Sequence, residues 1–306
     1  MIFTPVLLIA FNRPKTTLIV FDRIRKAQPK KLFIALDGPR NNKEGEREAC
    51  SKVQSIIENI DWDCEVHYKI NISNKGAEIT VSSAISWVFE TEEYVIILED
   101  DIVAPIAFFE FAQEMLIKYK NDDQIGTITS NNFTPLELSN NNNNKDYFFA
   151  KYGHSWGWAT WRRVWNDFDL NAEISEEHLT LSFLKTITNS NKEARYYQKL
   201  FKKMKERGVG QNTWDFMALY QHRIKNRLSI IPRVNLSSNI GVFGLHARGE
   251  SKFHNLPFDE SFKVNHHPQK IECFDAYDKY HFKKHIIGNR IPFYSRVIRK
   301  IKRLLK

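Results

Sequence analysis

The 306-residue sequence has few cysteines and no long hydrophobic run. Its three cysteines, Cys50, Cys64 and Cys273, are widely spaced, so they form neither a zinc-binding pattern nor a disulfide framework. A reducing cytoplasm is therefore the simplest compartment. No stretch approaches the ~20 apolar residues of a membrane-spanning helix. The apolar run from Pro5 to Phe11 lacks a preceding basic region and stops at Asn12-Arg13-Pro14, which indicates a strand and not a signal peptide.

Two nucleotide-binding signatures are also missing. The chain has no Gly-x-Gly-x-x-Gly and no Walker-type Gly-Lys-Ser/Thr, which excludes a dinucleotide fingerprint and a P-loop as explanations. Acidic residues are absent from residues 290–306, which hold seven Lys or Arg. The formal net charge of +9 implies anionic partners, and nucleic acid, a membrane surface and nucleotide-linked substrates all qualify.

Apolar residues make up 42% of the chain and aromatic residues 13%, enough to bury a sizeable core. The length allows about two domains, or one large α/β domain with additions. Buried strands and helices alternate in the N-terminal part, which predicts a mostly parallel sheet covered on both faces. The expected strands are 5–10, 31–36, 64–70 and 94–98, and the expected helices are 16–26 (capped by Thr16 or Thr17), 42–60 and 77–89.

The remainder of the chain is predicted in less detail. Five consecutive asparagines, Asn140 to Asn144, indicate a solvated loop tip. Residues 250–288 are rich in His, Phe and Tyr and predict no regular element. Helices are expected over 106–119, 175–189 and 192–207, and strands over 125–129 and 229–234.

The chain is organised around residues 94–102, where a buried strand ends in Glu99, Asp100 and Asp101. Three adjacent anions repel each other unless a positive group lies among them. A divalent cation with oxygen ligands is the usual solution, and such ions bring phosphates with them. Ligands also gather at the carboxyl ends of strands in open α/β sheets. An acidic turn that caps the next helix is the alternative, but the carboxylates follow the strand directly, which favours a metal–nucleotide site.

Four of the seven tryptophans fall within ten residues, in the segment 152–165. A core-filling aromatic cluster is one interpretation. The other is a pocket wall, because small residues such as Gly157 and Ala159 lie between the large flat rings and allow a ligand to approach closely. Flat rings also stack on the apolar faces of sugars. On this second interpretation the tryptophan rings are stacking surfaces for sugar rings or bases.

Three polar residues in the second half are open to two interpretations each. Asp215 follows a candidate helix cap, Thr213, and is either a helix-start acid or a catalytic base. His246 and Arg248 lie in a glycine-containing loop, where they are either surface residues or ligands of a diphosphate and its metal.

The C-terminal residues 293–306 combine an apolar stripe with six basic residues. This pattern is typical of an interfacial helix on anionic lipid. A terminal helix that docks on the protein body with a solvated basic face fits equally well.

The stretch Leu98-Glu99-Asp100-Asp101 resembles the metal motif of GT-A glycosyltransferases, in the Glu-Asp-Asp form seen in N-acetylglucosaminyltransferase I. Together with other matches it resembles a bacterial group of nucleotide-sugar transferases over about residues 3–248, and the order and spacing of the matches are fairly specific. The further matches are Ala10–Pro14, Leu36–Pro39, the Gly76 loop, Ala84–Glu90, Ser155–Trp161, Trp214-Asp215 and Asn235–Gly241.

The resemblance implies a role for each matching residue. Asp101 would bind Mn²⁺ (or Mg²⁺), with His246 as a second ligand, and Asp215 would be the base. Two departures are the serine at position 130, where the family often has glycine, and a one-residue ambiguity in aligning the His246 region. The donor-binding residues would be Arg13, Asp37, Lys75, Gly76, Glu99, Asp100 and Arg248. The acceptor-binding residues would be Trp156, Trp158, Trp161 and Trp214.

The sequence thus predicts an α/β protein of GT-A type with a C-terminal helical extension. Residues 1–135 would bind the nucleotide sugar, 136–249 would form the acceptor and catalytic half, and 250–306 the extension. The predicted activity is metal-dependent, inverting transfer from a nucleoside diphosphate sugar, preferably a UDP-sugar, to a saccharide or lipid-linked acceptor in bacterial surface polysaccharide synthesis. The protein would be cytoplasmic and would contact the inner face of the membrane through residues 290–306.

Two other functions stay open. A sugar-nucleotide nucleotidyltransferase would use a similar half, although it usually carries a glycine-rich basic signature after the first strand, where this chain has Phe11-Asn12-Arg13-Pro14. A non-enzymatic basic protein that binds membrane or RNA would not need Asp101. Nucleic acid is the less favoured partner, because the basic tail is amphipathic and does not form a groove with interleaved aromatic residues.

Overall fold

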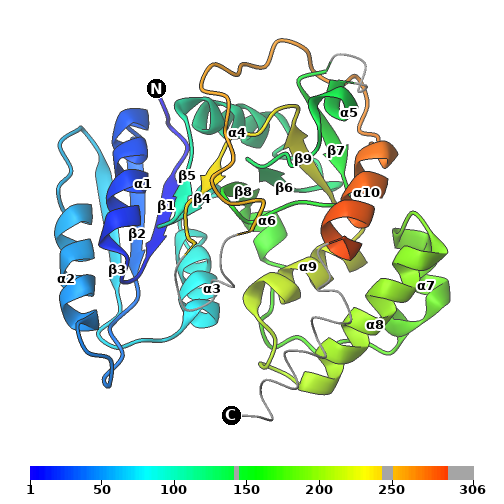
Figure 1. Ribbon diagram of the computed structural model, residues 1–306, viewed down its shortest axis with the longest axis horizontal. Coiled ribbons are helices and arrows are strands. Elements are labelled where there is room, and N and C mark those ends of the chain that lie inside the picture. Colours follow the sequence, from blue (N-terminus) through cyan, green and yellow to red (C-terminus); the bar gives the residue numbers. More distant parts are fainter. Residues whose placement is uncertain (141–144, 243–250, 289–306) are drawn as a thin grey trace.

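The computed structural model describes residues 1–140, 145–242 and 251–288. One eight-stranded mixed sheet runs through the molecule in the order β3-β2-β1-β4-β8-β6-β9-β7 (Figure 1). Neighbours from β3 to β4 are parallel, as are β6 and β9, whereas β8 and β7 run antiparallel to their neighbours. The strands are β1 Val6–Ala10, β2 Lys31–Leu36, β3 Glu65–Ile70, β4 Tyr94–Glu99, β6 Ile125–Thr129, β7 Tyr147–Ala150, β8 Trp158–Trp161 and β9 Leu228–Pro232.

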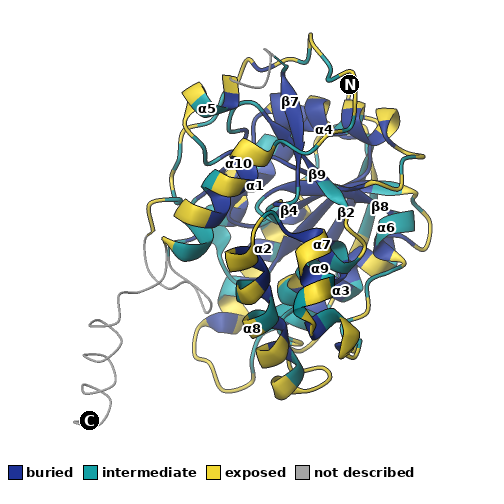
Figure 2. Ribbon diagram, turned by 90° about the vertical axis from the view of Figure 1, so that its right-hand side faces the viewer, coloured by how far each residue is buried: buried dark blue, intermediate teal, exposed yellow. Residues whose placement is uncertain are grey.

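Helices cover both faces of this sheet because its strands are apolar on both sides. Along β1, Val6 and Leu8 join the core beneath one helical layer, and Leu7 and Ile9 join the core beneath the other. The first layer contains α1 Pro14–Ala27, α2 Glu46–Ile57 and α4 Ile106–Lys118, and the second contains α3 Ala77–Val88 and α9 Trp214–Ile224. Figure 2 shows the strands as a buried interior between these layers.

A second core lies beside β7, where Phe148 and Tyr152 pack against helices from the second half of the chain. Its helices are α7 Leu181–Ile187, α8 Asn191–Arg207, α9 and α10 Asp275–His281, which continues into the π-helix η2 Phe282–Ile287. Within the part of the chain that the structure describes, no helix is long and apolar enough to span a membrane. Smaller elements are β5 Ile102–Val103, β10 Ser238–Asn239, α5 Leu136–Asn140, α6 Arg162–Trp165 and the 3₁₀ helix η1 Glu177–Leu179.

The α/β class and the large, mostly parallel sheet flanked by helices are confirmed. Several details of the prediction are wrong. Helix α1 begins at Pro14 and not after a threonine cap, because proline suits the first helical position, where no N–H partner is needed. The helix expected over 42–60 is confined to Glu46–Ile57. The helix expected over 175–189 is split, since extended Thr180 caps α7 by accepting a bond from the Phe183 N–H.

The segment 250–288 is not irregular throughout, because α10 and η2 occupy its last part. Neither strand β7 nor strand β8 was predicted. The small residues of the tryptophan-rich segment favour a loop, but hydrogen bonding to β4 and β6 makes Trp158–Trp161 a central strand.

Candidate functional site

The three predicted carboxylates lie at the carboxyl end of β4, next to the end of β1. Because β1 and β4 are parallel neighbours, the loop after β1 reaches the same sheet edge. Arg13, from this loop, donates from Nη1 to Oδ2 of Asp101 at 2.6 Å, and its other terminal nitrogen donates to Asp100. The Phe11 backbone N–H also donates to Asp100. Arg13 is therefore the positive group that the adjacent acids require.

Gly241 brings a third segment to the same point. A Cβ atom at this position would lie 2.0 Å from Oδ2 of Asp101 and 3.0 Å from Nη1 of Arg13. Only glycine therefore fits here without displacing these two side chains. The preceding strand β10 pairs with β5, which directly follows the acids, and the Ile240 N–H donates to the Asp101 carbonyl at 2.9 Å. Gly241 belongs to the Asn235–Gly241 motif, but the sequence prediction assigned it no role in the site.

Glu99 and Asp215 lie near enough to influence each other. Burial, followed by the charges of Asp101 and Asp100, raises the pKa of Glu99 to about 8, and the Asp215 carboxylate adds to this increase. Burial also raises the pKa of Asp100, although Arg13 opposes it. Asp215 itself is exposed in the first turn of α9 and accepts a hydrogen bond from the Thr213 hydroxyl.

The donor atoms of this site suit a hard divalent cation, since carboxylate oxygens are its preferred ligands and one or two of them suffice when phosphates supply others. Among residues 1–140, 145–242 and 251–288, no three His, Cys, Asp or Glu side chains are grouped to hold a metal. A cation bound to Asp101 would thus depend on ligands from a substrate and would meet the Arg13 guanidinium. His246 and Arg248, the other predicted ligands, lie outside the described residues.

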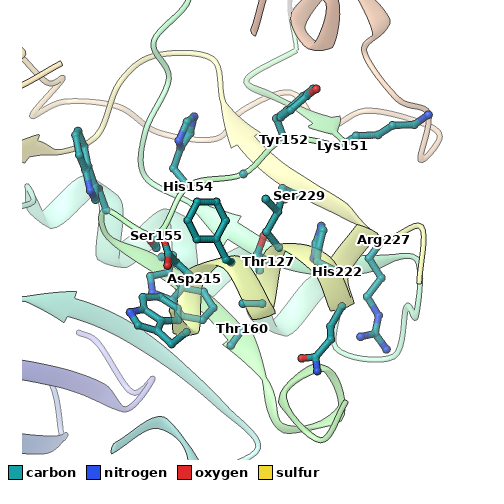
Figure 3. Close-up of a pocket in the computed structure, with 18 of the residues that line it drawn as sticks. Thr127, Lys151, Tyr152, His154, Ser155, Thr160, Asp215, His222, Arg227 and Ser229 are labelled. Carbon is teal, nitrogen blue, oxygen red and sulfur yellow. The ribbon is translucent and has the colours of Figure 1, made fainter. Parts of the chain in front are cut away.

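A cavity of about 480 Å³ lies between the sheet and helices α8 and α9, with Asp215 in its wall (Figure 3). Trp158 and Trp214 line it and stack on each other, with ring centroids 6.0 Å apart and an interplanar angle of 18°. Trp156 lines it as well and meets the Phe133 ring edge-on at 5.9 Å. Three of the four predicted acceptor-binding tryptophans are therefore brought to one cavity.

Trp161 does not line this cavity. It is 2% exposed, packs in the core under α4, and donates its indole N–H to the Leu116 carbonyl at 2.9 Å. Side chains three positions apart in a strand point to opposite faces, so β8 separates Trp161 from Trp158. The acceptor-binding prediction is corrected here: it is kept for Trp156, Trp158 and Trp214.

Asp37 lies at the end of β2, as predicted, but its carboxylate holds a loop of the protein. It accepts hydrogen bonds from the backbone N–H groups of Gly38, Lys75 and Gly76 at 2.9 to 3.1 Å. The side-chain amides of Asn71 and Asn74 donate to it as well. Five donors fill the ≈ four lone-pair positions of a carboxylate. Asp37, Lys75 and Gly76 thus form one structural unit, and donor binding by them stays a prediction.

The sequence prediction placed no histidine in this cavity. His154, His222, His281 and His285 all line it. The histidine-rich composition of residues 250–288 was the only sequence signal for two of them, and it carried no information on position.

No protein family model matches the chain, and no characterised protein matches it in sequence. Three solved structures are similar at a distance. HddC from Yersinia pseudotuberculosis has 10% identity and a TM-score of 0.32, covering 54% of this chain and 80% of its own. A UDP-glucose pyrophosphorylase complexed with UDP-glucose has 8% identity and a TM-score of 0.36, covering 75% and 90%. Mouse xyloside xylosyltransferase 1 has 12% identity and a TM-score of 0.32, covering 71% and 81%. Similarities this distant carry no information about the reaction.

Proposed function

We propose that the protein is a metal-dependent, inverting glycosyltransferase that moves a sugar from a nucleoside diphosphate sugar to an acceptor hydroxyl. The observation that carries this proposal is the juxtaposition at the end of β4. Three acids and Arg13 lie together there. An aromatic cavity with Asp215 in its wall lies nearby, and the charge of Asp215 helps to raise the pKa of Glu99. The acids and Arg13 would bind the donor, and the aromatic cavity would bind the acceptor.

The roles of the residues follow from the charges that glycosyl transfer creates. The leaving diphosphate gains negative charge, which a Mn²⁺ or Mg²⁺ held by Asp101 would neutralise when bound. Arg13, already beside Asp101, is positioned to turn its guanidinium toward the same oxygens. Asp100 is fixed by Arg13 and by the Phe11 N–H, so it holds the end of β1 against the end of β4.

Asp215 is the proposed general base. The acceptor hydroxyl must lose its proton as it attacks, and a carboxylate within hydrogen-bond reach accepts it. The Thr213 hydroxyl bonds to Asp215 and orients that carboxylate. One base that faces one leaving group produces direct displacement, which inverts the configuration at the anomeric carbon. Trp156, Trp158 and Trp214 would carry the apolar faces of the acceptor.

A UDP-sugar as donor, bacterial surface polysaccharide as product, and membrane contact remain part of this proposal. Membrane contact depends on residues 290–306, which lie outside the described residues. Deletion of these residues should release the protein from anionic liposomes, and unchanged binding after the deletion would contradict membrane contact by these residues.

The first test is donor binding and hydrolysis across a panel of nucleotide sugars, with and without Mn²⁺. Wild type is compared with Asp101→Ala and with a surface control, Asp63→Ala, whose side chain is 92% exposed. We expect metal-dependent binding of one nucleotide sugar, an activity loss of about 10²-fold or more in Asp101→Ala, and no loss in the control. Binding that ignores both metal and Asp101 would overturn the proposal.

A further inference from the structure

The net positive charge of the chain is confined to two segments. Of the 45 basic and 36 acidic residues, helix α8 holds seven and two, and residues 290–306 hold seven and none. The rest of the chain, with 31 basic and 34 acidic residues, is slightly negative. Positive charge that is concentrated in this way indicates a localised anionic partner.

Helix α8 carries its charge on the face that points away from the protein. Its apolar residues, among them Tyr197 and Phe201, pack in the second core. The residues on the opposite side recur at three- and four-residue spacing, so they form one stripe along the helix, about 17 Å long. All of them are exposed, and we call them the basic stripe: Lys192, Arg195, Lys199, Lys202, Lys203 and, at the end, Glu206. Figure 2 shows α8 at the edge of the molecule.

The cations of the basic stripe repel one another. Arg195, Lys199 and Lys203 follow at four-residue spacing, and like charges at this spacing destabilise a helix. Exposed lysines on other helices are arranged differently. Lys26 on α1 and Lys52 on α2 each form a salt bridge with an acid four residues earlier. An anionic partner would remove the repulsion along α8.

No described residue forms a salt bridge with a cation of the basic stripe. Glu176 lies close to the stripe, but its carboxylate is paired with Lys205 at 2.7 Å. The hydrogen bond from Lys205 lowers the pKa of Glu176, and the charge of Lys202 adds to the decrease. The stripe therefore keeps its charge available to a partner.

The composition of the basic stripe suits a diffuse anionic surface. Four of its five cations are lysines, which are point charges on flexible stems, whereas bidentate binding of a single phosphate or carboxylate favours arginine. The stripe contains no aromatic residue, and single-stranded nucleic acid would stack its bases on aromatic rings. A lipid surface with anionic headgroups fits the stripe better than either of these ligands.

An exposed apolar side chain follows directly after α8. Val209 is 57% exposed, and it lies between Gly208 and Gly210, both of which have positive φ. An apolar residue next to a row of cations is the combination by which peripheral proteins enter the boundary between headgroups and acyl chains.

Helix α8 also packs on the element from which the chain continues into its second basic segment. The ring of Tyr196 meets that of Phe282 in η2 edge-on at 5.8 Å. The helix η2 ends at Ile287, three residues before the segment 290–306. Both segments that hold net positive charge are thus connected to the same part of the fold.

We infer that the basic stripe of α8 docks the folded protein on an anionic lipid surface, with Val209 at the level of the headgroups. The proposed function assigns membrane contact to residues 290–306 alone, whereas this surface belongs to the body of the protein and does not depend on the reaction. Tyr196 and Leu200 of α8 line the cavity, so docking through α8 would hold the cavity close to the membrane.

Co-sedimentation of the full chain with vesicles at physiological ionic strength tests this inference. The vesicles are an equimolar mixture of phosphatidylethanolamine and phosphatidylglycerol, or phosphatidylcholine alone. A lysine near an anionic leaflet contributes about fivefold to binding. We therefore expect Lys199→Gln/Lys202→Gln/Lys203→Gln to bind the anionic vesicles at least about tenfold more weakly than wild type. Unchanged binding by this variant, or equal binding of wild type to phosphatidylcholine, would overturn the inference.

Lys26→Gln/Lys52→Gln/Lys120→Gln is the matched control. It makes the same change in net charge at exposed lysines outside α8. The control should bind anionic vesicles like wild type, and the melting temperature of the α8 variant should stay the same or rise, because repulsion along the helix is reduced. Equal loss of binding in both variants would show that net charge alone matters and would overturn the assignment to α8.

Binding of poly(U) distinguishes a nucleic-acid partner from a lipid surface. We expect poly(U) to bind more weakly than anionic vesicles at the same ionic strength. If it bound as tightly and lost as much affinity in the α8 variant, the partner would be nucleic acid and the inference would be overturned.

The two proposals fail in different ways. Vesicle binding that depends on the three lysines, together with no binding of any nucleotide sugar, supports the docking surface and rejects glycosyl transfer. Metal-dependent donor hydrolysis together with equal vesicle binding by wild type and the α8 variant keeps glycosyl transfer and rejects the docking surface.

Discussion

Ionisable side chains are buried both at the end of β4 and in the wall of the cavity. At the strand end they are paired with a cation, whereas in the cavity they are uncharged. Asp100 and Asp101 lie against a cation, because Arg13 donates a hydrogen bond to each. His154 and His281 remain neutral, because burial disfavours their charged forms. One fold therefore holds charged groups at a strand end and uncharged groups in a cavity. The first suits a diphosphate with its cation, and the second suits a sugar.

A second buried arginine reinforces this contrast. Arg223 lies behind the cavity wall, with its guanidinium carbon 4.2 Å from the ring centre of Tyr152 and 4.8 Å from that of Tyr197. Its Nη1 is 3.8 Å from the carboxylate of Glu193, which also accepts a hydrogen bond from the Tyr152 hydroxyl. The guanidinium nitrogens of Arg223 are thus enclosed by protein groups and have no hydrogen-bond partner among the described residues, whereas those of Arg13 donate to Asp100 and Asp101.

The largest effect expected within this comparison is that of Asp215→Asn, which removes the proposed base from between the two sites. Transfer to an acceptor should fall by about 10²–10⁴-fold, the usual contribution of a general base. The effect should be on kcat far more than on the KM for the donor. Steady-state kinetics with the donor found in the panel measure both.

Thr213→Val is the graded control for this substitution. It removes the hydroxyl that bonds to Asp215 but leaves the carboxylate, so its loss of kcat should be smaller. Near-full transfer activity in Asp215→Asn would place the base elsewhere.

The next largest effect concerns the charged site at the end of β4. Gly241→Ala should displace Asp101 and Arg13, because the new Cβ would lie 2.0 Å from the Asp101 carboxylate oxygen. Overpacking of this kind costs about 1–3 kcal/mol, and we expect Mn²⁺-dependent donor turnover to fall by about tenfold or more while saccharide binding persists. Donor kinetics and calorimetry with a saccharide acceptor report on the two sites separately.

Gly208→Ala serves as its matched control. Position 208 has φ of +91° and open space around it, so the substitution strains the backbone without touching either site. It should lower stability by about 1–3 kcal/mol and leave donor turnover intact. If both glycine variants lost turnover equally, the effect of Gly241→Ala would be one of stability alone.

The last effect concerns the histidines of the cavity, which make the free energy of unfolding depend on pH. Burial is the main cause that lowers the pKa of His154 to about 3 and the pKa of His285 to about 4 in the folded protein. The neighbouring group that adds to the decrease is His285 for His154 and Lys252 for His285. The unfolded chain therefore binds more protons below pH ~6.5, so the free energy of unfolding falls as pH falls. We expect the histidines to contribute a loss on the order of a few kcal/mol between about pH 7 and about pH 4. Glu99 contributes in the opposite direction, because its pKa is raised to about 8, so the histidine part is measured as the difference between wild type and His285→Phe in urea unfolding.

His285→Phe should flatten part of this pH profile, because one titrating group is removed. The paired carboxylate of Glu46 does not produce the same loss of stability in the upper part of this pH range. The hydrogen bond from Arg40 lowers the pKa of Glu46 to about 2, so its contribution is lost only below about pH 4.5. Identical profiles for wild type and variant above that pH would contradict a neutral His285.

Local patterns in the sequence were sufficient for the first half of the fold and for one site. The strand 94–99 and its terminal acids could be predicted because an apolar run and the charges that end it are properties of neighbouring residues. Parallel strands place their carboxyl ends on one edge, which also accounts for Arg13 beside Asp100. The meeting of Trp156, Trp158 and Trp214 at one cavity was expected from residue type, and their role in acceptor binding stays a prediction.

Tertiary structure decided the rest, because long-range pairing leaves no local pattern. Trp161 belongs to the core and not to the cavity because β8 inserts between β4 and β6, which fixes the faces of its side chains. Gly241 matters through its contact with a carboxylate 140 positions earlier in the chain. His154 and His281 are 127 positions apart, and only the packing of α10 against β7 brings their rings together. The sequence by itself determined a charged strand end, whereas the uncharged cavity beside it exists only in the folded chain.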